Sequence, residues 1–393
     1  MSPRVSRRMA QVQAPVIPVV AGLVQRHPGT LSLGQGVAYY GPPPAALRRA
    51  EAFLAAGGEH RYGPVQGHAE LIAAIAHKLS IENGIDCAQG RRIVVTAGAN
   101  MGFLNALWAI TDPGDEVILP SPYYFNQEMA ARMLSCRPVP VPGDAQCLPT
   151  IEGLARAITA RSRAIVTVSP NNPSGAVYPE PLLRAINTLC RDHGLYHITD
   201  EAYEYFTFGD TRHFSPAALH GSEAHTISLF SLSKAYGFAG WRIGYMVLPE
   251  HLYEAVLKAQ DTNLICATGI AQYAALGALE SGRRYCESRL PAMQAARDAI
   301  LVRLGEIGEL CSVGAGQGAL YLLVKVHTGM HAMHLVERLI ERHRVAVIPG
   351  HAFGIESGCY VRVSYGSAGP DLADEGARRL VEGLKDLLGN NQR

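Results

Sequence analysis

Residues 231–245 read SLSKAYGFAGWRIGY, and the fold assignment depends on this segment. Lys234 follows two serines, Ser231 and Ser233, and Arg242 comes eight residues after the lysine. A lysine amine can condense with an aldehyde to a Schiff base, while two hydroxyls and a guanidinium hold a phosphate nearby. A lone lysine is ordinarily a solvated surface charge, but phosphate-binding groups accompany this one at fixed spacing. The segment therefore predicts a covalently held, phosphorylated carbonyl cofactor.

The pattern S-x-S-K-x-x-G-x-x-G-x-R-x-G-Y in this segment resembles the lysine segment of class I and II aminotransferases. These are fold-type-I enzymes that use pyridoxal 5'-phosphate (PLP). The resemblance implies that Lys234 binds PLP covalently and that Ser231, Ser233 and Arg242 bind its phosphate. It also implies an α/β fold of type I, in which a mainly parallel seven-stranded sheet has helices on both faces and is joined to a smaller α+β domain.

Short apolar runs alternate with helix-length stretches along the chain, as the fold requires. They lie at residues 93–96, 117–119, 138–141, 164–168, 195–199, 226–230 and 243–248. Apolar strands without polar alternation, separated by helices, indicate a mainly parallel sheet that is covered on both faces. Ligands of such sheets bind outside the carboxyl ends of the strands. We expect a large PLP-binding domain over residues 44–285, and a small domain made of residues 286–393 with the N-terminal arm, residues 1–43.

The composition is that of an ordinary globular protein. The chain has 393 residues, a hydrophobic content of 48% and a net charge of +1, so we expect no nucleic-acid partner. The eight cysteines form no C-x-x-C pair and predict reduced thiols in a cytoplasmic protein. An apolar run over residues 14–24 follows several arginines, as in a signal peptide, but Pro15 and Pro18 interrupt it. It is also too short to cross a bilayer, so we expect no membrane attachment.

A cluster of histidines near residue 330 could suggest a metal site. His327, His331 and His334 have spacings that would place them near one another on a helix. No acidic or cysteine ligand joins them, and the start of a helix explains the segment. We therefore predict no metal.

Two groups of candidate cofactor ligands follow the first predicted strands. In TAGANMGF, residues 96–103, Gly98, Ala99 and Asn100 begin a helix whose backbone N–H groups would bind a phosphate. A single glycine is weak support alone, but the resembling family has its phosphate-binding turn here. In SPYYF, residues 121–125, one aromatic ring should cover a face of the pyridine, and similar segments favour Tyr124 over Tyr123.

Later strand ends carry three more residues that the resemblance assigns to the cofactor. Asn172, in SPNNPSG, would donate to the ring oxygen, although an Asn-Pro turn explains the same residues. Asp200, in DEAYEYF, would pair with the pyridine nitrogen and keep it protonated, which makes the ring an electron sink. Tyr203 would hydrogen-bond the ring oxygen from the same strand end.

Substrate and partner contacts are implied at three further places. Gly36 begins a Gly- and Pro-rich loop that would close the substrate site, with Tyr39 and Tyr40 at its entrance. Arg362, in YVRVSYG, would bind the substrate α-carboxylate with its guanidinium fork; a surface salt bridge would be the default without the resemblance. Tyr62 would reach the cofactor phosphate of a partner subunit, which makes the expected enzyme an obligate homodimer.

The resemblance implies a PLP-dependent aminotransferase that exchanges an amino group between an α-amino acid and a 2-oxo acid in a ping-pong cycle. Lys234, released from the cofactor, would move the Cα proton. Relatives resembling aspartate aminotransferases often have a lysine where this chain has Asn100, so we expect a neutral or aromatic substrate. An aspartate-type aminotransferase and a PLP-dependent lyase or oxidase on the same fold remain alternatives. A ligand-sensing domain of a DNA-binding regulator is disfavoured, because the N-terminal arm is short and only weakly basic.

Overall fold

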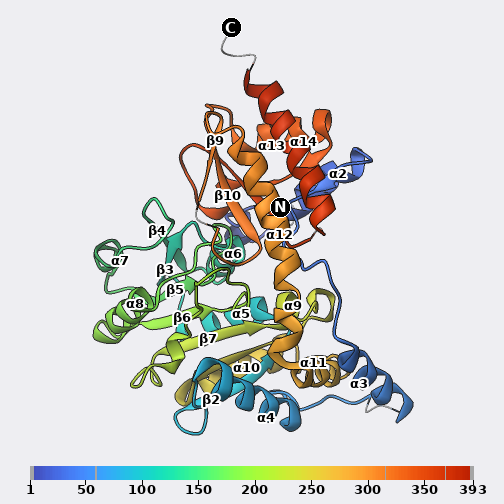
Figure 1. Cartoon of the computed structure of the whole chain (residues 1–393). Helices are drawn as coiled ribbons and strands as arrows, with labels where there is room; N and C mark the ends of the chain where they lie inside the picture. Colours follow the sequence, from blue (N-terminus) through green and yellow to red (C-terminus); the bar gives the residue numbers. More distant parts are fainter. Residues whose placement is uncertain (1–3, 58–59, 315, 368, 390–393) are drawn as a thin grey trace.

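The computed structural model describes residues 4–57, 60–314, 316–367 and 369–389. It consists of a large part built on a seven-stranded sheet and a smaller part built on a four-stranded sheet (Figure 1). The large part occupies the lower half of Figure 1, and the smaller part lies above it, together with the N-terminal helix α2 (Val16–Arg26).

The large sheet is mainly parallel, as the sequence predicts. Its strands are β2 (Arg91–Thr96), β3 (Glu116–Ser121), β4 (Arg137–Pro142), β5 (Ser162–Val168), β6 (Tyr196–Asp200), β7 (Thr226–Ser231) and β8 (Gly244–Pro249). They are ordered β2-β8-β7-β6-β5-β3-β4. Only β8 runs against its neighbours, since it pairs antiparallel with β2 and β7 while the other pairs are parallel.

Helices cover both faces of this sheet, which explains the continuous apolar runs in its strands. Neighbouring residues of a strand point to opposite faces. Val94 of β2 accordingly packs in a core with α5 (Ala99–Ile110) and α10 (Tyr253–Asn263), whereas Val95 belongs to the core on the other face, with α4 (Ala69–Lys78) and α11 (Gly269–Glu287). Toward β4, the second face is covered by α7 (Ile151–Ala157) and α8 (Glu180–Asp192). A strand buried on both faces is apolar along most of its length.

The smaller part is an antiparallel sheet of order β12-β13-β10-β9, packed with three helices. Its strands are β9 (Cys311–Val313), β10 (Tyr321–Val326), β12 (Ile348–Pro349) and β13 (Cys359–Ser364), and its helices are α12 (Leu290–Gly305), α13 (Ala332–His343) and α14 (Pro370–Gly389). The N-terminal segment joins this part, because β1 (Leu31–Ser32) pairs in parallel with β11 (Val345–Ala346). The exact domain boundaries given above stay a prediction.

Two local segments of the sequence can be compared directly with the structure. The apolar N-terminal run forms α2, in which Pro18 lies in the first turn, where a backbone N–H has no intrahelical partner. In the histidine-rich segment, His331 is the N-cap of α13, and its Nδ1 accepts a hydrogen bond from the Met333 amide. Within the described ranges, no helix combines the length and the apolar content needed to cross a membrane.

Candidate active site

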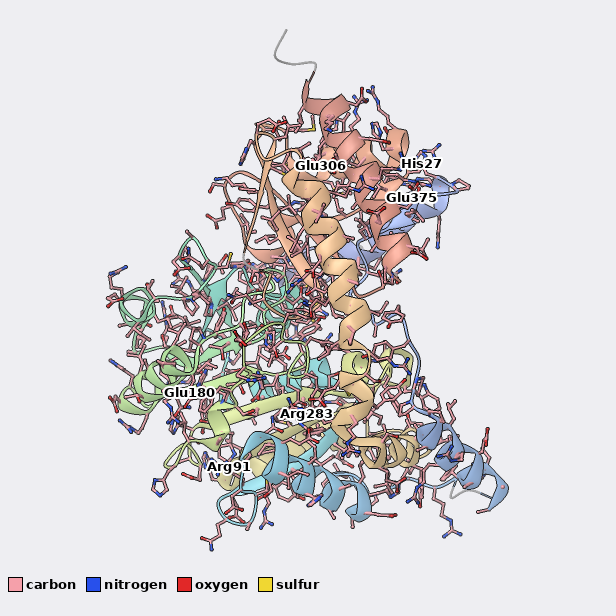
Figure 2. All side chains as sticks on the ribbon, in the orientation of Figure 1. His27, Arg91, Glu180, Arg283, Glu306 and Glu375 are labelled. Carbon is pink, nitrogen blue, oxygen red and sulfur yellow. The ribbon has the colours of Figure 1, made fainter. Side chains whose placement is uncertain are left out.

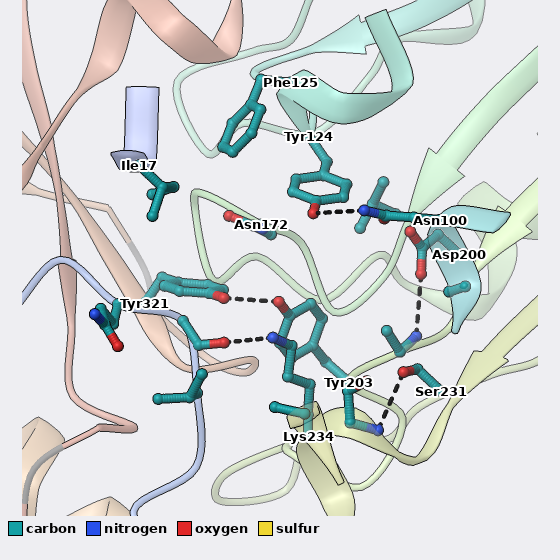
Figure 3. Close-up of a pocket in the computed structure, with 18 of the residues that line it drawn as sticks. Ile17, Asn100, Tyr124, Phe125, Asn172, Asp200, Tyr203, Ser231, Lys234 and Tyr321 are labelled. Carbon is teal, nitrogen blue, oxygen red and sulfur yellow. Dashed lines mark hydrogen bonds between the residues drawn. The ribbon is translucent and has the colours of Figure 1, made fainter. Parts of the chain in front are cut away.

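A cavity of about 450 Å³ lies at the carboxyl ends of the parallel strands, between the large sheet and residues of the smaller part (Figure 3). Asp200 ends β6 and Ser231 ends β7, so the strands themselves deliver these side chains to the cavity. The predicted site residues that line it are Gly36, Ala99, Asn100, Tyr124, Asn172, Asp200, Tyr203, Ser231, Ser233, Lys234, Arg242 and Arg362. The structure thus brings together residues that lie more than 300 positions apart in the sequence.

Lys234 is held in the short helix α9 (Leu232–Ala235), directly after β7. The Ser231 hydroxyl caps this helix by accepting a hydrogen bond from the Ser233 amide at 3.1 Å. The lysine Nζ donates to the Gly36 carbonyl. Burial, together with the positive charges of Arg362 and Arg242, lowers the pKa of the Lys234 amine to about 8. The amine is therefore closer to its neutral, nucleophilic form at physiological pH than a solvated lysine would be.

An anion-binding cradle forms where β2 leads into α5. The backbone N–H groups of Ala99 and Asn100 lie in the first turn of this helix, where they have no intrahelical acceptor. Gly98 precedes them with a φ of 81°, and a Cβ at this position would lie 2.4 Å from Arg242 Nη2. Only glycine therefore lets the guanidinium come so close to the turn. Arg242 Nη1 also donates to the Ser233 hydroxyl at 3.3 Å.

Asp200 is buried in the cavity wall, and few hydrogen-bond donors contact its carboxylate. Its carboxylate accepts from the Ala202 amide at 3.2 Å and from Gln127 Nε2 at 3.0 Å. Burial raises the pKa of Asp200 to about 6, so the group is still mainly ionised at neutral pH. Gln127 is on α6 (Phe125–Met133) and is itself buried, yet its sequence context does not mark it as a site residue. The remaining carboxylate lone pairs are available for a cation in the cavity.

Arg362 is also buried, with 2% of its surface exposed, which excludes the surface salt bridge that is the default for an arginine. Its Nη1 donates to the Asn172 side chain at 2.8 Å and its Nη2 to the Gly34 carbonyl at 2.7 Å. The guanidinium carbon lies 4.3 Å from the centre of the Tyr321 ring. Its buried Nε has no hydrogen-bond partner among the described atoms. A buried guanidinium that lines the cavity without a carboxylate partner among the described residues indicates a place for an anionic ligand.

Tyr321 is the main lining residue that the sequence does not reveal. Its hydroxyl lies 2.7 Å from that of Tyr203, and the hydrogen bond between them is one of those that join the two parts of the molecule. A Cβ on Gly36 would lie 2.0 Å from the Tyr321 hydroxyl, which explains why that position carries glycine. Figure 3 also shows Ile17 and Phe125 beside the cavity, from α2 and α6. Tyr321 is the first residue of β10, and its sequence context does not show which face of that strand meets the cavity.

Three predicted residues are not brought together with the others. Tyr39 and Tyr40 are not among the described lining residues, and their place at the entrance stays a prediction. Tyr39 packs edge-on against Tyr40, at 5.3 Å between ring centres, and the Tyr40 hydroxyl donates to the Ala235 carbonyl. Tyr62 is 80% exposed in the single chain and lies by a separate hollow with Leu264. Its predicted contact needs a second subunit and stays a prediction.

Comparison with known proteins identifies the family. The sequence model described as "Aminotransferase class I and II" matches residues 28–380. The chain belongs to the class I and II aminotransferases. It is 36% identical to Aromatic aminotransferase ISS1 of Arabidopsis thaliana, over 98% of this chain and 97% of that protein. It is 35% identical to a "Probable aspartate/prephenate aminotransferase" of Aquifex aeolicus, over 84% and 85%. The crystal structure of an aromatic aminotransferase from Pyrococcus horikoshii superposes with a TM-score of 0.87 at 32% identity, covering 94% of this chain and 99% of that one.

Aminotransferases of this family use PLP, and the cavity of this chain fits that cofactor. The cradle at Gly98 and Arg242 offers backbone N–H groups, hydroxyls and a guanidinium to a phosphate. The Lys234 amine is available to an aldehyde, and Asp200 to a protonated pyridine nitrogen. The enzyme is therefore a PLP-dependent aminotransferase that acts on amino acids and 2-oxo acids.

Proposed function

We propose that this aminotransferase prefers α-amino acids with a neutral or aromatic side chain. The observation that carries the proposal is the charge of the cavity. Among the described lining residues, the charged ones are Asp200, Lys234, Arg242 and Arg362. Each of them has a partner in PLP or in the α-carboxylate that all amino acid substrates share. No cation on the described part of this wall remains for the second carboxylate of aspartate or glutamate.

The rest of the wall supports the same preference. Ile17, Val37 and Phe125 add apolar surface to the cavity. Asn100, which is exposed, stands where a lysine would face a distal carboxylate. An apolar wall favours apolar side chains through the area that it removes from water. The similarity to a relative named aromatic aminotransferase agrees with this proposal. The similarity to the aspartate/prephenate relative agrees with the alternative, an aspartate-type aminotransferase.

We propose the following roles for the residues that hold the reactants. Arg362, which lines the cavity, binds the α-carboxylate through its guanidinium. Asp200 accepts the ring N–H, and Asn172 and Tyr203 donate to the ring oxygen, while the Tyr124 ring covers one ring face. PLP, when bound, supplies the electron sink for the electrons of the bond that breaks at the substrate Cα.

Lys234 is the residue we propose to move the Cα proton. Its amine has a lowered pKa, so it can accept a proton near neutral pH. The Gly36 carbonyl accepts a hydrogen bond from the same amine and holds it at the cavity wall. A base that is fixed in place and only weakly solvated meets both requirements for proton transfer, geometry and matched pKa.

A half-reaction tests the substrate class. The PLP-loaded enzyme is mixed with one amino acid and no 2-oxo acid, and the visible absorption of the cofactor and the released 2-oxo acid are measured. We expect one 2-oxo acid per site, with phenylalanine or another neutral amino acid reacting faster than aspartate, and no reaction in Lys234→Ala. A higher kcat/KM for aspartate would refute the preference. Continuous product release without 2-oxo acid acceptor would indicate a lyase or an oxidase instead.

We also propose a homodimer in which Tyr62 of one subunit contacts the phosphate site of the other, in the cytoplasm. The exposed ring of Tyr62 and the eight free thiols support these two proposals. Mixed dimers of Lys234→Ala and Tyr62→Phe chains provide the test. One of the two sites in such a dimer has both an intact lysine and an intact tyrosine, so we expect the PLP affinity of that site to match the wild type. Unrestored affinity in dimers shown to be mixed would contradict the contact.

A further inference from the structure

One segment, residues 34–41, contacts two of the cations of the site through its backbone carbonyl groups. Arg362 donates through Nη2 to the Gly34 carbonyl at 2.7 Å, and Lys234 donates through Nζ to the Gly36 carbonyl. The segment also forms part of the cavity wall. Its position therefore affects both the group proposed to bind the α-carboxylate and the group proposed to move the Cα proton.

The far end of this segment is fastened on two sides. The Tyr40 hydroxyl donates at 2.9 Å to the carbonyl of Ala235, the residue that follows the catalytic lysine. The Tyr285 hydroxyl donates at 2.6 Å to the carbonyl of Gly41. The lysine segment also lies directly against this end, because a Cβ on Gly237 would be 2.5 Å from the carbonyl oxygens of Tyr40 and Gly41. Glycine at position 237 is what permits this contact.

A cation joins the two tyrosines. The guanidinium carbon of Arg289 lies 5.4 Å from the ring centre of Tyr40 and 4.9 Å from that of Tyr285. The two rings meet edge to face, with 5.9 Å between centres and 79° between planes. The buried Nε of Arg289 has no hydrogen-bond partner among the described atoms, so the aromatic faces are the prominent contacts of this cation. We refer to Tyr40, Tyr285 and Arg289 as the clasp.

The clasp lies where the chain passes from the large part to the smaller one. Tyr285 is near the end of α11, and Arg289 immediately precedes α12. Figure 2 labels Arg283 at the lower end of this helical path and Glu306 at its upper end, in the smaller part of the molecule. The smaller part also carries Arg362 on β13. Segment 34–41 is thus tied at Gly34 to the smaller part and, through the clasp, to the start of the connecting helix.

We propose that the clasp is a positioning device for the substrate site: Tyr40, Tyr285 and Arg289 hold segment 34–41 so that its carbonyls orient Arg362 and Lys234. The inference rests on the proposed roles of those two residues. None of the clasp residues lines the cavity, so they act through the segment and not on the substrate. Burial raises the pKa of the Tyr40 hydroxyl, which stays a neutral hydrogen-bond donor throughout the working pH range.

The test compares Tyr40→Phe, Tyr285→Phe, Arg289→Met and Arg289→Lys with a matched control, Tyr253→Phe. The guanidinium carbon of Arg92 lies 5.6 Å from the centre of the Tyr253 ring, so this tyrosine also has a cation–π contact. Like the clasp residues, Tyr253 does not line the cavity. The first measurement is backbone hydrogen exchange, in the protein without PLP, of residues 34–41 and of residues 236–238, whose amides donate hydrogen bonds within the lysine segment. The second is KM and kcat of the loaded enzyme for the amino acid in the full reaction, with a saturating 2-oxo acid. Exchange without PLP requires no assumption about the reaction, so failure of the clasp and failure of the proposed site roles can be told apart.

We expect faster exchange of these amides in both Phe variants and in Arg289→Met. In Arg289→Lys, which keeps the cation, we expect an exchange rate between those of Arg289→Met and the wild type. We expect KM to rise about two- to tenfold for each hydroxyl removed, the usual worth of one hydrogen bond, with a smaller change in kcat. The control should change neither quantity. Faster exchange with unchanged KM would show a purely structural contact and overturn the proposal. Unchanged exchange would show that the segment holds its position without the clasp and would also overturn it.

Discussion

Replacing Arg362 with lysine tests whether its guanidinium binds the carboxylate of the substrate. The arginine uses Nη1 for Asn172 and Nη2 for Gly34, and its buried Nε has no described partner. An ammonium keeps the charge, but its donors radiate from one atom and cannot serve Asn172, Gly34 and a substrate carboxylate together. The variant should therefore lose about one charge-assisted hydrogen bond to the ligand. Such a bond contributes about 1.5–3 kcal/mol, which corresponds to roughly a 10- to 150-fold weaker affinity.

Two unreactive ligands separate this effect from general damage. 3-Phenylpropionate carries the carboxylate, and 3-phenylpropionamide has nearly the same shape without the charge. Calorimetry of both ligands with the PLP-loaded wild type and Arg362→Lys gives four dissociation constants. We expect the acid to lose the full 10- to 150-fold and the amide less than about threefold, because the amide does not depend on a cation. An equal loss for both ligands would refute the reasoning, since it would mean that the lysine only disturbs the wall around Asn172 and Tyr321.

Other predictions concern charge and pH. Asn100→Lys should raise kcat/KM for aspartate about two- to fivefold in steady-state assays, because a pair at this exposed position is screened by water. The PLP affinity of the wild type should fall below pH 6, where protonated Asp200 no longer accepts the charged ring nitrogen, and calorimetry should show a weaker pH dependence in Asp200→Asn. Gln127→Leu removes a hydrogen-bond donor to that carboxylate, so the pH below which the PLP affinity falls should rise by about one unit. The rate of covalent PLP capture, followed by absorbance, should rise with pH and level off above about 8, where Lys234 is neutral.

The sequence predicts the sheet well because a strand buried on both faces appears in the sequence as a short, nearly continuous apolar run. The middle of β3 is Val117, Ile118 and Leu119, β8 is apolar along most of its length, and Asp200 and Ser231 are the last residues of their strands. The reversed direction of β8 cannot be predicted in this way, because a strand that runs antiparallel between β2 and β7 is as apolar as its neighbours. The family motif, and not the periodicity, gives the expected identity of the residues at the strand ends.

The residues that the sequence does not reveal are those placed by packing between distant elements. Gln127 reaches Asp200 only because α6 lies over the end of β6, and Tyr321 reaches Tyr203 only because the smaller part closes over the large sheet. The direction of the Tyr40 ring is another feature that the sequence does not reveal. A tyrosine in a loop beside a glycine looks like a substrate contact, but whether its ring turns toward the cavity or toward α11 depends on Tyr285, which lies about 245 residues further along the chain.

The charge of the cavity explains how the same residues serve both the cofactor and the substrate. Three described lining residues are cationic and one is anionic, so the empty cavity favours anions, and mutual repulsion helps to lower the pKa of Lys234. A phosphate next to Arg242 and a carboxylate next to Arg362 each reduce that repulsion, and both therefore bind more tightly than isolated contacts would suggest. The same anions make the amine harder to deprotonate, since they favour its charged form. Saturating 3-phenylpropionate, whose carboxylate is expected next to Arg362 and not in the phosphate cradle, should accordingly raise the pH at which the rate of PLP capture levels off. An unchanged pH profile would mean that burial alone sets the pKa of the amine.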